Sequence, residues 1–196
     1  MITANFLVAG VGGQGTLLAS DIMAEVGLRL GVDVKKSEVH GMSQRGGAVI
    51  SHVRWGEQVA SPLCEKGTVD YFVAQEMLEA LRWIEFVRPG GTLLLNRQHI
   101  VPTSTVYGAD QYPSDEQVIA VLRQAAGRIL SIDARRIAEE LGNPRVANSV
   151  LLGALSAQLE APAEDWLAVI ESRVPPRHVE VNRQAFAAGR EGDWAI

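Results

Sequence analysis

The stretch Asn5-Phe-Leu-Val-Ala-Gly-Val-Gly-Gly-Gln-Gly15 decides how this chain begins to fold. Its first five residues form a short apolar run that is typical of a buried strand. Glycines follow at once, and apolar residues then recur at helical spacing, at Leu18, Ile22 and Val26. The sequence therefore predicts a strand, a tight glycine turn and a helix that runs from about residue 15 to residue 30.

The turn satisfies the pattern G-x-G-x-x-G, and its candidate contact residues are Gly10, Gly12, Gly13, Gln14 and Gly15. In this position glycine lets a phosphate or another backbone approach the N–H groups at the start of the helix. A dinucleotide site also needs an acid about 20 residues later, and Asp33 and Glu38 only bracket that region. Two interpretations stay open: the glycines pack the strand against the helix, or the turn contacts a ligand or partner.

A second segment, His40-Gly-Met-Ser-Gln-Arg-Gly-Gly47, combines glycine with polar side chains. We expect residues 38–47 to form an ordered loop, for which a solvated surface loop is the alternative. Arg45 is able to clamp a carboxylate or a phosphate with two parallel hydrogen bonds. The candidate contact residues are His40, Gly41, Met42, Ser43, Gln44, Arg45, Gly46 and Gly47.

The rest of the chain alternates between strand and helix patterns. Strands are expected over residues 32–36, 49–55, 69–74, 92–95 and 129–132, with a short partner strand around Val59 and a wetter face at His52 and Arg54. Helices are expected after residue 77, after a capping box at Ser114 and Gln117, and from Pro144, Pro162 and Pro175 onward. This order predicts an α/β fold, a Rossmann-like three-layer sandwich with a mostly parallel sheet and a helical C-terminal extension, in a single domain of residues 1–196.

Composition excludes several classes of protein. The 196 residues carry a formal net charge of −5, which argues against a nucleic-acid-binding protein. The single cysteine, Cys64, cannot form a disulfide within the chain or hold an iron–sulfur cluster, which needs about four ligands. No apolar run approaches the ~20 residues that cross a membrane, and no signal peptide is recognisable at the start. We therefore expect a cytoplasmic protein without a membrane anchor.

Side chains with reactive chemistry give no further pattern. The four histidines lack the spacing of metal ligands, so no metal site is expected. Cys64 has no partner motif and is interpreted as a small apolar residue. No Gly-x-Ser-x-Gly elbow occurs, and no catalytic residue is assigned.

The two glycine-containing segments together resemble a known family. Residues 6–20 are similar to the opening of the gamma domain of 2-oxoacid:ferredoxin oxidoreductases, and residues 37–54 resemble the second signature of that family. The form Glu38-Val-His-Gly-Met42 is most similar to the beta subunit of the family's indolepyruvate enzymes. Weaker similarity continues at residues 89–91, 148–153 and 181–186, so the resemblance spans nearly the whole chain.

The resemblance implies a subunit without a cofactor of its own. In the family, thiamine diphosphate with Mg and [4Fe-4S] clusters on a large alpha subunit decarboxylate and oxidise the 2-oxoacid. Electrons pass to ferredoxin, and the acyl group passes to the co-substrate coenzyme A. The chain is then expected to act in a heteromer on indolepyruvate or other aryl pyruvates and to be inactive alone. We expect residues 10–15 and 40–47 to lie side by side and face the partner subunit.

Three alternatives stay open from the sequence. In the first, the chain is a stand-alone Rossmann-type oxidoreductase that binds NAD(P) or FAD at residues 10–15. In the second, it is a non-catalytic assembly protein with the same fold. In the third, the chain belongs to the family, but its enzyme acts on phenylglyoxylate, pyruvate or another 2-oxoacid.

Overall fold

A computed structural model describes residues 2–40, 47–101 and 112–196 of the chain. Within these residues, six strands form one sheet in the order β2-β3-β1-β4-β5-β6. The strands are β1 (Ala4–Val11), β2 (Asp33–His40), β3 (Ala48–Gly56), β4 (Val69–Ala74), β5 (Val87–Asn96) and β6 (Arg128–Ile132).

The helices between and after the strands follow the expected order. They are α1 (Thr16–Arg29), α2 (Met77–Trp83), α4 (Asp115–Ala125), α5 (Ala134–Glu140), α6 (Ala147–Ser156), α7 (Ala163–Arg173) and α8 (Val179–Glu191). Short 3₁₀ helices occur at η1 (Ile84–Phe86), η2 (Pro144–Val146) and η3 (Pro176–His178). The predicted capping box is confirmed, since the Ser114 hydroxyl accepts from the Gln117 N–H and the Gln117 side chain accepts from the Ser114 N–H.

The sheet is mostly parallel, as predicted. Strands β1, β4, β5 and β6 run in one direction in neighbouring pairs. Strand β3 runs antiparallel to both β1 and β2, so β2 points the same way as β1 but does not touch it. This antiparallel insertion separates the fold from a sheet in which the second strand pairs directly with the first.

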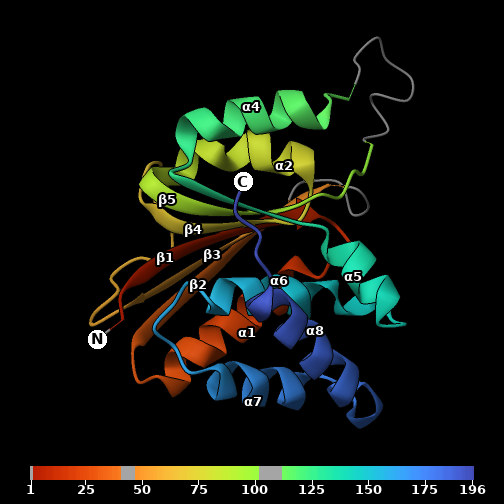
Figure 1. Cartoon of the computed structure of the whole chain (residues 1–196). Coiled ribbons are helices and arrows are strands. Elements are labelled where there is room, and N and C mark those ends of the chain that lie inside the picture. Colours follow the sequence, from red (N-terminus) through yellow and green to blue (C-terminus); the bar gives the residue numbers. More distant parts are fainter. Residues whose placement is uncertain (1, 41–46, 102–111) are drawn as a thin grey trace.

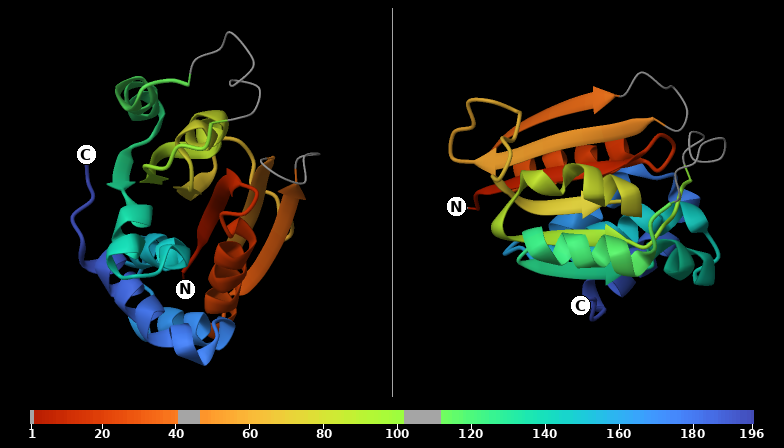
Figure 2. Two further views of the ribbon diagram at one scale, coloured as in Figure 1. Left: turned by 90° about the vertical axis from the view of Figure 1, so that its right-hand side faces the viewer. Right: turned by 90° about the horizontal axis from the view of Figure 1, so that it is seen from above.

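Helices cover both faces of the sheet and give the expected three layers (Figure 1). Helices α2 and α4 lie on one face, while α1, α5, α6, α7 and α8 lie on the other. Figure 2 shows the same layering from two further sides. Strand side chains therefore pack into two separate apolar clusters, because alternate residues of a strand point to opposite faces. Phe6 and Val8 belong to one cluster, and Leu7 and Ala9 to the other.

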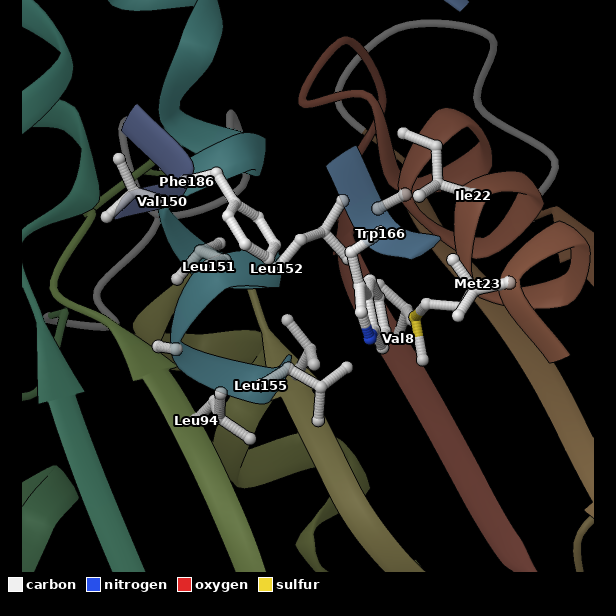
Figure 3. Packing of buried hydrophobic residues seen from close by; sticks show 14 of the residues in the cluster. Val8, Ile22, Met23, Leu94, Val150, Leu151, Leu152, Leu155, Trp166 and Phe186 are labelled. Atoms are coloured by element: carbon white, nitrogen blue, oxygen red, sulfur yellow. The ribbon is translucent and has the colours of Figure 1, made fainter. Parts of the chain in front are cut away.

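The larger cluster joins the C-terminal helices to the sheet (Figure 3). Trp166 of α7 and Phe186 of α8 are almost completely buried and pack with leucines of α6 and with Ile22 and Met23 of α1. Helices α6 and α8 approach closely at Gly153, where a Cβ atom would lie only 2.0 Å from the Phe186 carbonyl oxygen. The C-terminal extension is thus part of the main core.

The C-terminal residues pair with β6, the last strand of the sheet. The Ser131 N–H donates to the Trp194 carbonyl over 2.8 Å, and the Ile196 N–H donates to the Ile129 carbonyl over 3.1 Å. Because an exposed sheet edge is a template for pairing with other chains, this short segment protects β6.

Three local expectations were wrong. Val59 is not in a strand, because both sides of β3 are already paired, and its N–H instead donates to the Asp33 carboxylate over 2.8 Å. Strand β2 extends to His40, so residues 38–40 belong to a strand instead of the expected loop. The face of β3 that carries His52 is not uniformly wetter, since His52 is buried.

Among the described residues, no helix is long and apolar enough to cross a membrane.

Candidate functional site

One edge of the sheet collects the two segments that the sequence singles out. Strands β1, β2, β4, β5 and β6 end there, and β3 begins there. We call this edge, with the loops and helix ends beside it, the carboxyl edge. In open α/β sheets, ligands bind outside the carboxyl ends of the strands.

The glycine turn leaves β1 at this edge and leads directly into α1. Gly13 and Gly15 have φ angles of 103° and 77°, which glycine adopts without strain. At Gly10, a Cβ atom would lie within 2.7–2.9 Å of polar atoms of Gln75, Gln14 and Thr16. At Gly15, it would lie 2.5 Å from the Asn148 side-chain nitrogen. Packing therefore explains Gly10 and Gly15, whereas the Cβ position of Gly13 is open, with nothing within 4 Å.

The Gln14 side chain points back toward the strand ends. Its Oε1 accepts from the Val11 N–H over 2.6 Å, and its Nε2 donates to the Gln75 carbonyl over 2.8 Å and to Gln98 Oε1 over 3.0 Å. Gln14 thus ties the turn to the ends of β4 and β5 and holds its shape.

A network of partly buried amides extends from the turn to α6. The Gln75 Nε2 donates to Asn148 Oδ1 over 2.6 Å, and the Thr16 hydroxyl donates to Gln75 Oε1 over 2.7 Å. Asn148 Nδ2 in turn donates to the carbonyls of Gln14 and Gly15, over 2.9 and 3.1 Å. Because these groups satisfy one another's hydrogen bonds, the network fixes the turn relative to α6.

Two further buried polar residues organise the ends of β4 and β5. Asn96 donates to the Gln75 carbonyl over 3.0 Å and accepts from the Ala134 N–H over 3.1 Å. Glu76 is 1% exposed and accepts from the first N–H groups of α2. Glu76 also accepts from the Tyr112 hydroxyl, and burial together with this carboxylate raises the pKa of Tyr112.

One end of the second segment, Gly47, lies beside the glycine turn, and the other end, His40, lies on β2 across β3. The Gly12 N–H donates to the Gly47 carbonyl over 3.0 Å, and Gly10 and His40 both pair with Val49 of β3. Of the predicted contact residues, Gly41, Met42, Ser43, Gln44, Arg45 and Gly46 lie outside the described residues. The chain therefore re-enters the described structure next to the turn at Gly47 and leaves it at His40 on β2, which β3 separates from β1. The side-by-side arrangement of the two segments stays a prediction.

A cavity of about 440 Å³ opens beside the turn. Gly13, Gln14 and Asn148 line one part of it, and Arg135 and Arg145 line another. Helix α1, whose first N–H groups have no partner inside the helix, begins directly after Gly15, which lines this cavity. Guanidinium groups and free backbone N–H groups suit an anionic ligand.

The acids considered for a dinucleotide ribose lie in unsuitable places. Asp33 pairs with Gly56, the last residue of β3, and therefore lies at the end of the sheet opposite the carboxyl edge and the glycine turn. Glu38 forms an ion pair with Lys36 of the same strand. Strand β2 is also separated from β1 by β3, so neither acid is placed to reach a nucleotide on the turn.

The other residues with reactive side chains have structural environments. Burial lowers the pKa of His52, whose Nδ1 accepts from the Cys64 N–H over 3.3 Å. Burial raises the pKa of the Cys64 thiol to about 11, and its sulfur lies 3.7 Å from the Phe6 carbonyl oxygen. His99 pairs with Asp115 over 2.6 Å. Within residues 2–40, 47–101 and 112–196, no group of three His, Cys, Asp or Glu is placed to hold a metal ion.

Sequence reasoning missed the amides that surround the turn. Gln75 directly follows β4 and Asn96 is the last residue of β5, each after a run of buried apolar residues, and that position is the signal that marks them. Gln98 lies two residues after the end of β5. Asn148 was noted only within residues 148–153, which resemble the family weakly. Nothing local in the sequence indicates that Asn148 meets Gln14, because 134 residues separate them.

Comparison with known proteins gives consistent matches over nearly the whole chain. The model of the family described as pyruvate ferredoxin/flavodoxin oxidoreductase matches residues 5–192. The indolepyruvate oxidoreductase subunit IorB of Pyrococcus horikoshii is 39% identical over 188 residues, which cover 94% of this chain and 93% of that protein.

Solved structures share the same architecture. The gamma subunit of a keto/oxoacid ferredoxin oxidoreductase from Geobacter sulfurreducens matches with a TM-score of 0.71 and 27% identity, over 96% of each chain. The 2-oxoglutarate:ferredoxin oxidoreductase of Magnetococcus marinus matches all of this chain with a TM-score of 0.75 and 21% identity. The match covers 32% of that chain, so the same fold also occurs as one part of a longer polypeptide.

Proposed function

Since this chain belongs to the pyruvate ferredoxin/flavodoxin oxidoreductase family as the small subunit of a 2-oxoacid:ferredoxin oxidoreductase, we propose that its enzyme oxidatively decarboxylates indolepyruvate and related aryl pyruvates. The observation that carries this proposal is the 39% identity to the Pyrococcus horikoshii IorB subunit across nearly the full length of both proteins. The chain acts as one domain and works in the cytoplasm.

The cofactors of the reaction are on the partner in this proposal. A large alpha subunit carries thiamine diphosphate with Mg and [4Fe-4S] clusters, and these groups supply the decarboxylation chemistry and the electron path to ferredoxin. The residues of this chain support that division, because its one thiol is buried, has a pKa raised to about 11 and lies against the Phe6 carbonyl.

The carboxyl edge is the part of this chain that faces the large subunit. Its partly buried amide network holds residues 10–15 in one shape, and Gly47, at one end of the segment 40–47, accepts from the Gly12 N–H of that turn. Two exposed leucines, Leu17 and Leu18, stand on the first turn of α1 beside them. A preorganised backbone flanked by exposed apolar side chains is what a stable subunit interface needs.

In this proposal, coenzyme A, the co-substrate, binds at the same edge. The cavity beside the turn is lined by Arg135 and Arg145, and the N–H groups at the start of α1 lie next to it. These donors match the phosphate groups of coenzyme A. Ser43, Gln44 and Arg45 of the second segment then contact the partner, the substrate carboxylate or a coenzyme A phosphate.

The substrate is tested with the purified two-subunit complex. Ferredoxin reduction is followed with indolepyruvate, phenylglyoxylate, pyruvate and 2-oxoglutarate, each with coenzyme A. The proposal expects the highest kcat/KM with indolepyruvate. A higher value with pyruvate or 2-oxoglutarate would reject the aryl pyruvate assignment and leave the family membership intact.

The contact role of Arg45 has its own test. Arg45→Ala in the complex is expected to lower kcat/KM by about tenfold or more, because a charge-assisted hydrogen bond is lost. Arg123→Ala is the matched control, since Arg123 is exposed on α4 at the other face of the sheet. Unchanged turnover of the Arg45→Ala complex would remove Arg45 from the site.

A further inference from the structure

A second and larger cavity lies behind α1, on the face of the sheet that α6, α7 and α8 cover. Its volume is about 650 Å³. It borders the cavity beside the glycine turn, with which it shares Leu18, Arg145 and Asn148, but it extends away from the turn toward α7 and α8. Beyond the three residues at this shared border, the proposed function assigns no role to this space.

The floor of the cavity is apolar. Ile22 of α1, Val146 of η2 and Ile170 of α7 are 3%, 2% and 1% exposed, so each shows the cavity only a small part of its surface. Val181 of α8 extends the apolar lining, and Leu18, which is 39% exposed, stands where the two cavities meet. An apolar ligand body of moderate size would be sheltered there from water.

The rim of the cavity is cationic. Its positive charge comes from Arg145, Arg173 and Arg177, beside which His178 also lines the cavity, and none of the described lining residues is acidic. The chain as a whole has 23 acidic and 18 basic residues, so this local excess of arginine is not a consequence of composition.

The arginines of the rim differ in what they already bind. Arg173 is occupied, since its guanidinium donates twice to Glu25 over 2.8 and 2.6 Å. Arg177 donates only its Nε to a described acceptor, His178 Nε2, over 3.2 Å. The side chain of Arg145 has no hydrogen-bond partner in the described part of the chain. Two guanidinium groups are therefore available to an incoming anion.

A fixed polar pair also lines the cavity. The Ser149 hydroxyl donates to Asn182 Oδ1 over 2.6 Å, and Asn182 Nδ2 donates to the His178 carbonyl over 2.7 Å. This pair is buried and joins α6 to the start of α8. It holds η3, which carries Arg177, at a set position above the apolar floor.

We propose that this cavity is a binding site for an organic carboxylate with an apolar aliphatic or aromatic body. The body packs on the floor at Ile22, Val146 and Ile170, and the carboxylate pairs with Arg145 and Arg177. The cavity volume lies within the range of about 300–1,000 Å³ that is common for small-molecule sites, and the planar guanidinium matches a carboxylate better than an ammonium group does.

The test uses the full chain and decanoate as the probe. Calorimetry is expected to show saturable binding of one decanoate per chain, with much weaker binding of decanol at the same concentration. Arg145→Gln and Arg177→Gln are each expected to weaken decanoate binding by about tenfold, because a charge-assisted hydrogen bond is lost. Arg123→Gln on the opposite face of the sheet is the matched control and should leave the affinity unchanged.

A second variant addresses the position of the site. Val181→Glu places a carboxylate at the cavity wall and should abolish binding by repelling the anion, with thermal unfolding as the check that the variant folds. The proposal is overturned if decanol binds as well as decanoate, if Arg123→Gln weakens binding as much as Arg177→Gln, or if no saturable binding occurs. Binding that survives in a folded Val181→Glu variant also overturns it.

Discussion

Gly15 is subject to two separate constraints, its φ of 77° and the Asn148 amide that lies 2.5 Å from the position of a Cβ atom. Gly15→Ala is therefore expected to destabilise the fold by about 1–3 kcal/mol through backbone strain and the displaced amide. In an Asn148→Ala background the second cost disappears, so the effect of Gly15→Ala should be smaller there. A double-mutant cycle by urea unfolding measures this coupling. If the changes in the free energy of unfolding of the two single variants add up strictly, Asn148 does not constrain the residue at position 15.

His52 is a second single residue that affects stability, and its contribution depends on pH. Burial lowers its pKa in the folded state below the ordinary value of 6.5, and its Nδ1 must stay unprotonated to accept from Cys64. As the pH falls through 6.5, the unfolded chain binds a proton before the folded chain does, so the free energy of unfolding decreases until the folded pKa is passed.

The measurement is urea unfolding between pH 7.5 and 5.5 for the wild type and for His52→Asn, whose Oδ1 is able to accept from Cys64. The variant should lose less stability over this range, because it has no group at this position to titrate. Equal losses in the two proteins would mean that His52 titrates alike in both states.

Among the elements, the crossing of α6 and α8 depends on the absence of one side chain. A Cβ atom on Gly153 would meet the Phe186 backbone oxygen at 2.0 Å, and backbone atoms of a helix cannot move aside as a flexible side chain does. Gly153→Ala should force the helices apart and destabilise the protein by about 1–3 kcal/mol. Gln184→Ala, on the exposed face of α8, should change stability by less than about 0.5 kcal/mol in the same unfolding assay.

Most elements were predictable because their patterns are local. The strand and helix around residues 5–30, the capping box at Ser114 and the prolines that precede α6 and α7 all depend on neighbouring residues. The antiparallel position of β3 was not predictable in this way, since pairing is decided between strands and not within them. The prediction of a strand at Val59 was wrong for that reason. Val59 follows β3 closely, but β3 already pairs with β2 on one side and with β1 on the other.

The candidate site was predictable only in part, and for a related reason. The glycine pattern marks the turn, but the groups that fix its shape come from the ends of β4 and β5 and from α6. Those contacts join residues between 61 and 134 positions apart, and they form only when parallel strands bring their carboxyl ends to one edge. The glycine motif therefore indicates where the site lies, and the fold brings together most of the residues that form it.

At the scale of the whole molecule, we propose that two polypeptides divide the work. In this proposal, the chain contributes a preorganised surface, formed by the glycine turn, the amide network and Gly47 of the second segment. The large subunit would contribute the cofactors and the path for electrons. The fold fits this division, because neither Asp33 nor Glu38 is placed to hold the ribose of a nucleotide bound on the turn.

Reconstitution tests this division most directly. The chain and the large subunit are purified separately, and ferredoxin reduction by indolepyruvate and coenzyme A is measured for each alone and for the mixture. The account predicts no turnover by the chain alone and turnover when the two are combined at equal concentration. Oxidation of a substrate by the isolated 196-residue chain, with a nucleotide bound at residues 10–15, would contradict it.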